Sequence, residues 1–168
     1  MLVDGAIWEA EPRVCGSPTS YPAAIPGIIA VGATGLDDRV TMFSNSGNHI
    51  SVAAPGKAIW STLPAYPGQT AFGVVFGSDR RPKLGVPVRR EINYDAWDGT
   101  SMAAPHVTGC AALFIAKGIA ANEKPTPAQV RQALMESADK VPAMNGSDFS
   151  VDYGTGRINL SRLLQAGR

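Results

Sequence analysis

The chain has 168 residues, of which 45% are hydrophobic, and its formal net charge is +1 at pH 7. This length and apolar content predict one globular domain with a substantial core, and the near-neutral charge gives no reason to expect a nucleic acid or an acidic membrane as a partner. No unbroken run of about 20 apolar residues is present, so no membrane-spanning segment is predicted. Residues 1–14 lack the basic start and apolar stretch of a signal peptide, so the sequence itself gives no localisation.

The first third of the chain predicts short strands separated by turns. Residues 12–27 are rich in proline and indicate an irregular lead-in. The glycine-bounded apolar run at 27–33 fits a buried strand, and 40–47 fits a short extended piece that ends in a polar turn. Residues 49–56 and 58–64 then repeat the pattern of a strand followed by a breaker.

Residues 65–92 form a longer and less regular insert. Within it, 71–77 and 83–89 predict a β-hairpin around a polar turn. The basic residues of the insert are Arg80, Arg81, Lys83, Arg89 and Arg90. Two interpretations of them stay open: they belong to a solvated loop, or they form a basic flap that borders the serine discussed below and shapes access to it.

The last third predicts helices. Residues 101–118 are small and apolar almost throughout, which indicates a helix buried on most sides. Residues 126–139 open with Thr126 as an expected N-cap and Pro127 at the first helical position. The apolar stripe of this helix consists of Val130, Ala133, Leu134 and Ala138. Residues 154–167 fit a tight turn, a brief strand and a closing helix, and the whole pattern predicts an α/β fold with a mainly parallel sheet.

The two cysteines, Cys15 and Cys110, are too few for a disulfide framework or a metal-ligand cluster. They are interpreted as two unpaired thiols. Their redox state stays open, because a disulfide requires a proximity that the sequence does not establish.

The stretch DGTSMAAPHVTG at 98–109 contains a serine at an expected helix start. In a regular helix the Ser101 carbonyl would accept the N–H of residue 105, but Pro105 has no N–H and its ring would crowd that carbonyl. Ser101 is therefore expected at the first turn or just before it, with Gly99 giving backbone freedom upstream. Backbone N–H groups at a helix start can hold a developing oxyanion, so Ser101 is a candidate nucleophile. The alternative is that Ser101 is only a helix cap.

The same stretch resembles the nucleophile signature of the subtilisin-like serine peptidases (subtilases, peptidase S8). The segments SYPAAIPGIIAVGAT, FSNSGNHISVAAPG, IWSTLP and YGTGRINLSRLL resemble, in the same order, successive parts of the C-terminal half of that family's catalytic domain. The likeness covers most of residues 17–166, apart from the insert. It implies a subtilisin-like three-layer α/β fold, present as its C-terminal portion, and the activity of a serine endopeptidase from a commonly secreted family.

Residue by residue, the resemblance implies that Ser101 is the nucleophile and that its backbone N–H is an oxyanion donor. Thr100 and Gly99 match the supporting residues beside it. The family presents its triad in the order Asp, His, Ser, and the Asp and His motifs do not occur here, nor does the asparagine oxyanion donor. Residues 1–16 are an atypical start, and the chain is expected to be the C-terminal part of a peptidase domain.

Neither histidine of the chain suits the role of general base. His106 follows Ser101 by five residues, and at about 100° per residue on a helix the two side chains point well apart. His106 is expected to be buried in a packing role, and His49, in a polar turn, is expected to face solvent. A general base must first lie within hydrogen-bond reach of the proton that it takes, and its pKa matters only then, so neither histidine is expected to be the base.

No cofactor is predicted. The resemblance implies carbonyl ligands near Tyr21 and Ile25 for a weak calcium site, but the strand position at which many relatives supply an acidic ligand is Ser51 here, so calcium is not predicted.

The expected function is peptide-bond hydrolysis through a Ser101 acyl-enzyme, with the chain alone nearly inactive because the base lies elsewhere. The alternatives are a small autonomous serine esterase and a non-catalytic pseudo-enzyme. The expected partners are a polypeptide substrate and either the missing N-terminal half or a second copy, which would pair with an open sheet edge.

Overall fold

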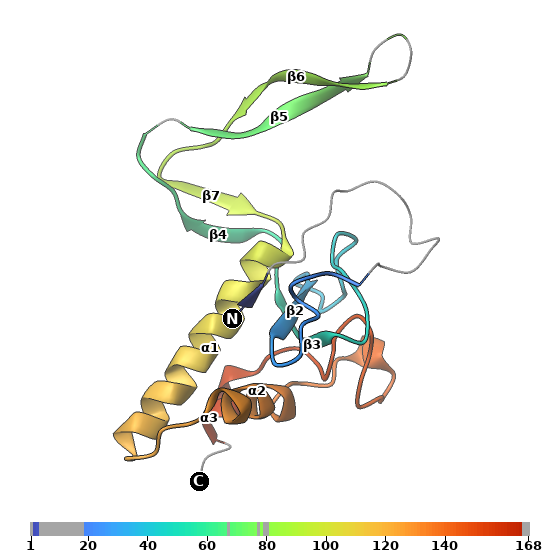
Figure 1. The fold of residues 1–168 in the computed structure, drawn as a ribbon. Coiled ribbons are helices and arrows are strands. Elements are labelled where there is room, and N and C mark those ends of the chain that lie inside the picture. Colours follow the sequence, from blue (N-terminus) through green and yellow to red (C-terminus); the bar gives the residue numbers. More distant parts are fainter. Residues whose placement is uncertain (1, 4–18, 67, 77, 79–80, 166–168) are drawn as a thin grey trace. The chain divides into compact units, whose positions relative to one another are not determined.

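A computed structural model describes residues 2–3, 19–66, 68–76, 78 and 81–165 (Figure 1). These residues form two units. One unit consists of residues up to Ala58 and from Asp98 onward, and the other of Ile59–Trp97. The first unit contains a parallel sheet and the described helices, and the second contains two antiparallel strand pairs.

The sheet of the first unit has the order β1-β2-β3, with all neighbours parallel. Its strands are β1 (Leu2–Val3), β2 (Ile29–Thr34) and β3 (Ile50–Pro55). Nearly every residue of β2 and β3 is buried. Strands buried on both faces have continuous rather than alternating apolar sequences, so the strands predicted near 27–33 and 49–56 are confirmed.

The prediction of an extended piece at 40–47 is wrong. Only Val40 forms an isolated antiparallel bridge to β2, and the following residues turn. A side chain, rather than the backbone of a neighbouring strand, accepts a backbone N–H of β2 here: the Ser44 hydroxyl accepts the Ala33 N–H over 2.9 Å. Such local polar side chains compete with strand pairing for backbone groups.

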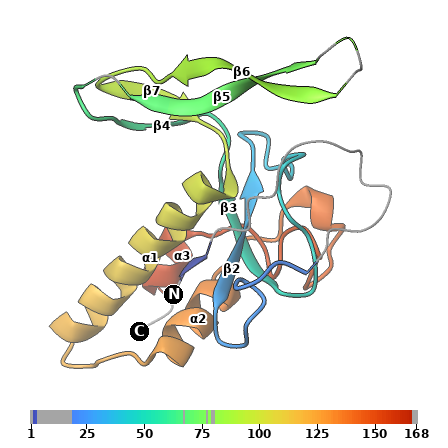
Figure 2. The ribbon, with the colours of Figure 1, turned by 45° about the horizontal axis from the view of Figure 1, so that its top comes forward.

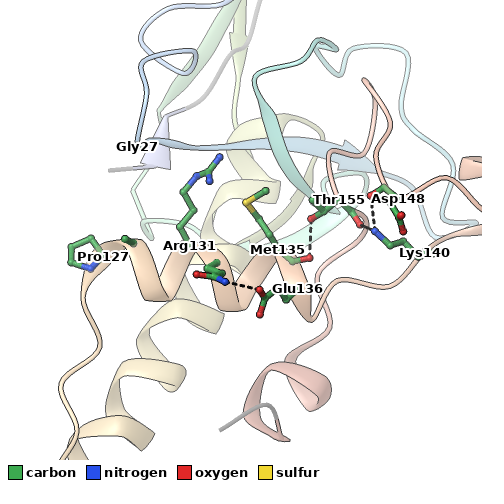
Figure 3. A pocket seen from close by; sticks show the side chains of 10 residues that line it. Gly27, Pro127, Arg131, Met135, Glu136, Lys140, Asp148 and Thr155 are labelled. Atoms are coloured by element: carbon green, nitrogen blue, oxygen red, sulfur yellow. Dashed lines mark hydrogen bonds between the residues drawn. The ribbon is translucent and has the colours of Figure 1, made fainter.

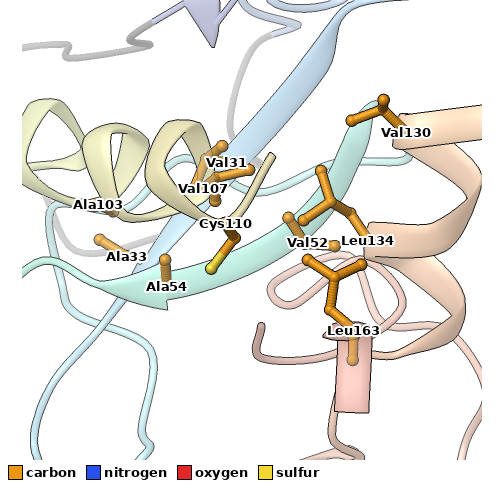
Figure 4. Close-up of a cluster of buried hydrophobic side chains, with 11 residues drawn as sticks. Val31, Ala33, Val52, Ala54, Ala103, Val107, Cys110, Val130, Leu134 and Leu163 are labelled. Atoms are coloured by element: carbon orange, nitrogen blue, oxygen red, sulfur yellow. The ribbon is translucent and has the colours of Figure 1, made fainter. Parts of the chain in front are cut away.

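One buried apolar cluster joins β2 and β3 to three helices: α1 (Thr100–Ala120), α2 (Pro127–Glu136) and α3 (Leu160–Gln165). Figure 2 shows these helices gathered beside β2 and β3. The cluster is built from Val31, Ala33, Val52, Ala54, Ala103, Val107, Cys110, Val130, Leu134, Ala138 and Leu163 (Figure 4). Burying each Val or Leu side chain contributes roughly 1.5–3 kcal/mol. The predicted helix over 101–118 is present as α1, but the prediction that it is buried on most sides is wrong. In the described structure the buried residues of α1 are Thr100, Ala103, Val107 and Cys110, which lie on the side that faces the sheet.

The N-terminus of α2 forms as predicted. The Thr126 hydroxyl accepts the Gln129 N–H over 3.3 Å, and the Gln129 side-chain oxygen accepts the Thr126 N–H over 2.8 Å. This reciprocal capping box, with Pro127 in the first turn, satisfies backbone donors that a helix start leaves unpaired.

The other apolar groups around the sheet come from loops. Ala53 of β3 clusters with Val141 and Met144, at the start and end of a short 3₁₀ helix, η1 (Pro142–Met144), and with Tyr153 of a later turn. The brief strand expected after residue 154 is reduced to two isolated bridges of Arg157, one parallel to Ala53 and one antiparallel to Asp139, whereas the closing helix is present as α3.

The second unit contains β4 (Ile59–Thr62) paired with β7 (Tyr94–Trp97), and β5 (Gln69–Phe76) paired with β6 (Pro82–Arg89). The predicted hairpin of the insert is therefore confirmed as β5–β6. No element was predicted at residues 94–97, where β7 lies.

The basic residues of the insert differ in exposure. Arg81, Lys83 and Arg89 are exposed, and Arg80 lies outside the described residues. Arg90 stacks over the Tyr66 ring at 5.0 Å and donates to the Tyr66 carbonyl over 3.0 Å. The guanidinium of Arg90 thus has a structural role inside the second unit. That the insert borders Ser101 stays a prediction.

Among the described helices, α1 alone is long and apolar enough to cross a membrane by length and composition. No membrane-spanning segment was predicted from the sequence, because α1 contains no unbroken run of about 20 apolar residues. The same length and composition occur in core helices, and α1 packs on β2 and β3 through Ala103, Val107 and Cys110.

Candidate active site

The chain enters α1 through a close approach of two glycines. The Gly99 N–H donates to the Gly56 carbonyl over 2.8 Å, and the Gly56 N–H donates to the Thr34 carbonyl over 2.9 Å. A Cβ on Gly56 would lie 2.7 Å from the Gly99 oxygen and 3.2 Å from the Ala103 Cβ. Only glycine at 56 therefore lets the start of α1 lie against the end of β3.

Gly99 is the N-cap of α1, with φ 156° and ψ 157°. Residues with side chains rarely adopt this φ, which explains the glycine predicted to give freedom here. The Gly99 carbonyl accepts the N–H groups of Met102 and Ala103 over 3.0 and 3.3 Å. The helix therefore begins immediately after Gly99.

Ser101 is the second residue of α1, and it is exposed, whereas Thr100 beside it is buried. Pro105 lies inside the helix, so it gives the Ser101 carbonyl no N–H at the i+4 position. The predicted position of Ser101 in the first turn is confirmed. The alternative that Ser101 caps the helix is wrong, because the N-cap is Gly99 and no side chain forms a cap hydrogen bond there.

Asp98 fixes the segment just before the helix. Its carboxylate accepts the Ala58 N–H over 2.6 Å and so joins the two chain segments that flank the second unit. Asp98 is not among the predicted site residues, although aspartate before glycine is a frequent turn signal. Its contact makes it a positioning residue for the Gly99 turn.

Neither histidine has the environment predicted for it. His106 is exposed rather than buried, because it lies on a side of α1 that the described residues leave open, and its Nδ1 lies 2.9 Å from the Met102 carbonyl. His49 is partly buried rather than solvent-facing, and its Nε2 is buried without a hydrogen-bond partner. Neither imidazole is hydrogen-bonded to Ser101 within the described part of the chain, so neither is positioned as its base.

Cys110 lies on the buried side of α1 as a free thiol, and burial raises its pKa. A raised pKa disfavours the thiolate, which is the nucleophilic form of cysteine. Cys110 therefore belongs to the core rather than to the reactive surface. Cys15 lies outside the described residues.

The residues present do not fit a calcium ion at the Ser51 position. Ser51 offers a neutral hydroxyl, which accepts from Arg131 Nη2 over 3.5 Å. Calcium prefers carboxylate and carbonyl oxygens, and an adjacent guanidinium repels a cation. Within the described residues no group of three or more His, Cys, Asp or Glu comes together to hold a metal.

The arrangement suits nucleophilic chemistry. A hydroxyl in the first turn of a helix lies near backbone N–H groups and the positive end of the helix dipole, both of which stabilise a developing oxyanion. A serine hydroxyl is a weak nucleophile until a base removes its proton. Neither histidine of the chain is placed to do so.

The chain is similar in sequence to known proteases. The model of the subtilase family matches residues 11–156. Fervidolysin of Fervidobacterium pennivorans is 38% identical over 148 residues, covering 86% of this chain and 19% of that protein. Subtilisin of Bacillus pumilus is 37% identical over 149 residues, covering 89% of this chain and 41% of that protein. The chain thus spans less than half the length of these relatives.

Solved structures give the same result for the fold. The crystal structure of fervidolysin, described as a keratinolytic enzyme related to subtilisin, superimposes with a TM-score of 0.61 at 36% identity, covering 86% of this chain and 20% of that one. The self-cleaved protease domain of PatA superimposes with a TM-score of 0.63 at 27% identity, covering 88% of this chain and 44% of that one. The chain has the α/β fold of the subtilisin-like proteases and belongs to the subtilase family.

Proposed function

We propose that this chain supplies the nucleophile of a subtilisin-type serine endopeptidase. The observation that carries the proposal is the placement of Ser101: it is exposed, and it lies in the first turn of α1, directly after the Gly99 N-cap and Thr100. A serine held there by a close glycine–glycine approach is oriented by the backbone rather than by a flexible loop.

In the proposed reaction, the Ser101 Oγ attacks the scissile carbonyl carbon, and an imidazole outside the described residues takes the hydroxyl proton. The Ser101 N–H donates to the oxyanion of the tetrahedral intermediate. The imidazole then protonates the leaving amine, and water hydrolyses the acyl-enzyme. Thr100 and Gly99 support this step by fixing the turn: Thr100 is buried, and Gly99 adopts a backbone conformation that other residues rarely reach.

The base is proposed to come from the remaining part of a subtilase domain, on this or another polypeptide. Two observations support this. The described residues leave one side of the helix open, with Leu113 and Ile119 exposed by 49% and 58%. The chain also spans only 41% of the subtilisin of Bacillus pumilus. A polypeptide that covers this side of α1 would bury apolar surface, which favours association.

A fluorophosphonate probe tests the proposal in a mixture of this chain with a polypeptide that carries the N-terminal half of a subtilase catalytic domain, and mass spectrometry identifies the modified residue. Modification at Ser101, lost in Ser101→Ala, is the expected result. Ser161 is the matched control, because it is also exposed and is also the second residue of a helix, α3. Ser161→Ala is expected to leave labelling of Ser101 unchanged. Labelling of Ser161 to the same extent as Ser101, or no labelling of Ser101 at all, would contradict the proposal.

A further inference from the structure

The first unit contains an open hollow of about 870 Å³, separate from the start of α1. It lies between α2, the turn before β2 and the segment leading to Thr155 (Figure 3). Its lining includes Pro127, Arg131, Met135, Lys140 and Thr155. Neither Ser101 nor its neighbours line it.

Arg131 enters this hollow with its hydrogen-bonding capacity largely unused. Its side chain extends from α2 toward Gly27 (Figure 3). A guanidinium has five N–H donors, yet the described residues give it one acceptor, the Ser51 hydroxyl, at 3.5 Å from Nη2. The Nε is buried without a partner. A buried charged donor without an acceptor is costly.

Other arginines of the same unit find carboxylates. Arg157 is paired with Asp38 and Asp139, and Arg162 is paired with Asp139 at 3.2 Å. Arg131 forms no ion pair with a described carboxylate. The Arg131 guanidinium thus differs from those of Arg157 and Arg162, which are held by carboxylates.

A second positive charge lies in the same hollow. The Lys140 ammonium donates to the carbonyls of Asp148 and Thr155, over 2.6 and 2.7 Å, rather than to a carboxylate. Of the two acidic residues that line the hollow, Glu136 accepts from Gln132 over 2.7 Å. Because Glu136 and Asp148 add negative charge nearby, a singly charged ligand suits the hollow better than a doubly charged phosphate.

We infer that the hollow binds a polypeptide carboxylate, held by the guanidinium of Arg131. A planar guanidinium matches a carboxylate through two parallel hydrogen bonds. The Met135 and Pro127 side chains offer apolar surface to the residue that carries the carboxylate, and methionine adapts to irregular partners. The carboxylate belongs either to a chain terminus or to an acidic side chain. This inference does not depend on Ser101 or on catalysis.

NMR of the arginine Nε–Hε groups tests the inference directly. The ¹⁵N-labelled chain, carrying Ser101→Ala so that no probe is cleaved, is titrated with acetylated alanine–leucine peptides. In the first pair, one peptide ends in a free carboxylate and the other in an amide. Both peptides of the second pair end in an amide, and one carries an internal glutamate where the other carries a glutamine. The Arg131 signal is expected to shift saturably with one or both acids and not with their neutral counterparts. The first pair reports binding of a terminus, and the second reports binding of a side chain.

Two arginine variants separate the hollow from general charge effects. Arg131→Gln is expected to weaken binding roughly 10- to 100-fold, the range for a lost hydrogen bond between charged groups. Arg39→Gln is the control, because Arg39 is exposed and lies on a different loop. Equal shifts with acid and neutral peptides, tighter binding of inorganic phosphate, unchanged affinity in Arg131→Gln, or no shift with any peptide would each overturn the inference.

A carboxylate built into the chain gives a second test. The Ser51 hydroxyl already lies at hydrogen-bond distance from Arg131, so Ser51→Asp places a carboxylate beside the guanidinium. This variant is expected to raise Tm and to weaken binding of the acidic peptide by at least about tenfold. Ser51→Ala is expected to keep the affinity. Unchanged peptide affinity in a folded Ser51→Asp protein would contradict the inference.

Discussion

The Gly56 carbonyl accepts the Gly99 N–H over 2.8 Å, where the helix that carries Ser101 begins. The hydrogen bond joins the end of a buried parallel strand to the first turn of α1. The position of the candidate nucleophile is therefore set by the core of the first unit.

Replacing Gly56 by alanine is expected to displace the start of α1. The new Cβ would lie 2.7 Å from both the Gly99 oxygen and the Ala33 Cβ, and neither is the end of a flexible side chain. Overpacking of this kind destabilises by about 1–3 kcal/mol. Urea unfolding measures the loss, and the rate of fluorophosphonate labelling in the presence of the N-terminal half of a subtilase domain reports the displacement of Ser101.

Gly109→Ala is the control for that substitution. Gly109 lies within α1, and a Cβ there meets nothing within 4 Å. Alanine is expected to stabilise the helix by roughly 0.5–1 kcal/mol and to leave labelling unchanged. A Gly56→Ala protein as stable and as reactive as the Gly109→Ala protein would show that the close approach is not needed.

The chain by itself is expected to hydrolyse peptides at a rate indistinguishable from that of Ser101→Ala. In subtilisin itself, removal of the catalytic histidine lowers kcat by on the order of 10⁶, a benchmark measured on that enzyme. A fluorogenic peptide assay with both proteins measures the difference. Hydrolysis that disappears in Ser101→Ala would show that a base is already present, and a p-nitrophenyl ester series would then distinguish a peptidase from an esterase.

Asp139 is expected to make stability depend on acid pH. Burial raises its pKa, but hydrogen bonds from Asn159, Arg162 and Arg157 outweigh burial and lower the pKa below the ordinary value. Because the folded pKa lies below the unfolded one, this contribution is complete above about pH 4, the ordinary aspartate value, and is lost as pH falls through the folded pKa.

Asp139→Asn is therefore expected to lower stability at pH 7 by about 1 kcal/mol, after solvent screening is allowed for, and to flatten the pH dependence below pH 4. Thermal unfolding between pH 2 and 7, roughly the range over which aspartate titrates, measures both effects. Asp37→Asn is the control, because the Asp37 side chain is largely exposed and its ion pair is long, with 3.8 Å between Asp37 Oδ2 and Arg39 Nε. An equal effect of both variants would contradict the role of the Asp139 network.

The Cys110 thiol is expected to react slowly in the folded protein. Burial raises its pKa, so the thiolate forms only at pH values above the ordinary cysteine value of about 8.5. In a Cys15→Ser protein, a thiol-reactive disulfide reagent at pH 8 should modify Cys110 only when urea unfolds the chain. Rapid modification without urea would show that the covered side of α1 opens.

The sequence determined those features that depend on local backbone chemistry. Pro105 predicted that Ser101 lies in the first turn, because a ring without an N–H excludes a regular helix upstream. Thr126 predicted the start of α2, because a hydroxyl that precedes a proline and a helical stripe caps the first turn. Buried strands and the β5–β6 hairpin followed from apolar runs bounded by turn residues.

Tertiary structure decided what depends on residues far apart in the chain. His106 is exposed although the surrounding sequence, 101–118, is largely apolar, because no described element covers that side of α1. The extended piece at 40–47 became a turn, because the Ser44 hydroxyl rather than a neighbouring strand satisfies the Ala33 N–H. Arg131 lies beside a hydroxyl instead of a carboxylate, which only the packing of α2 near β3 determines. A sequence specifies which groups a chain carries and how its backbone turns, but hydrogen-bond partners and burial depend on contacts that only the folded chain creates.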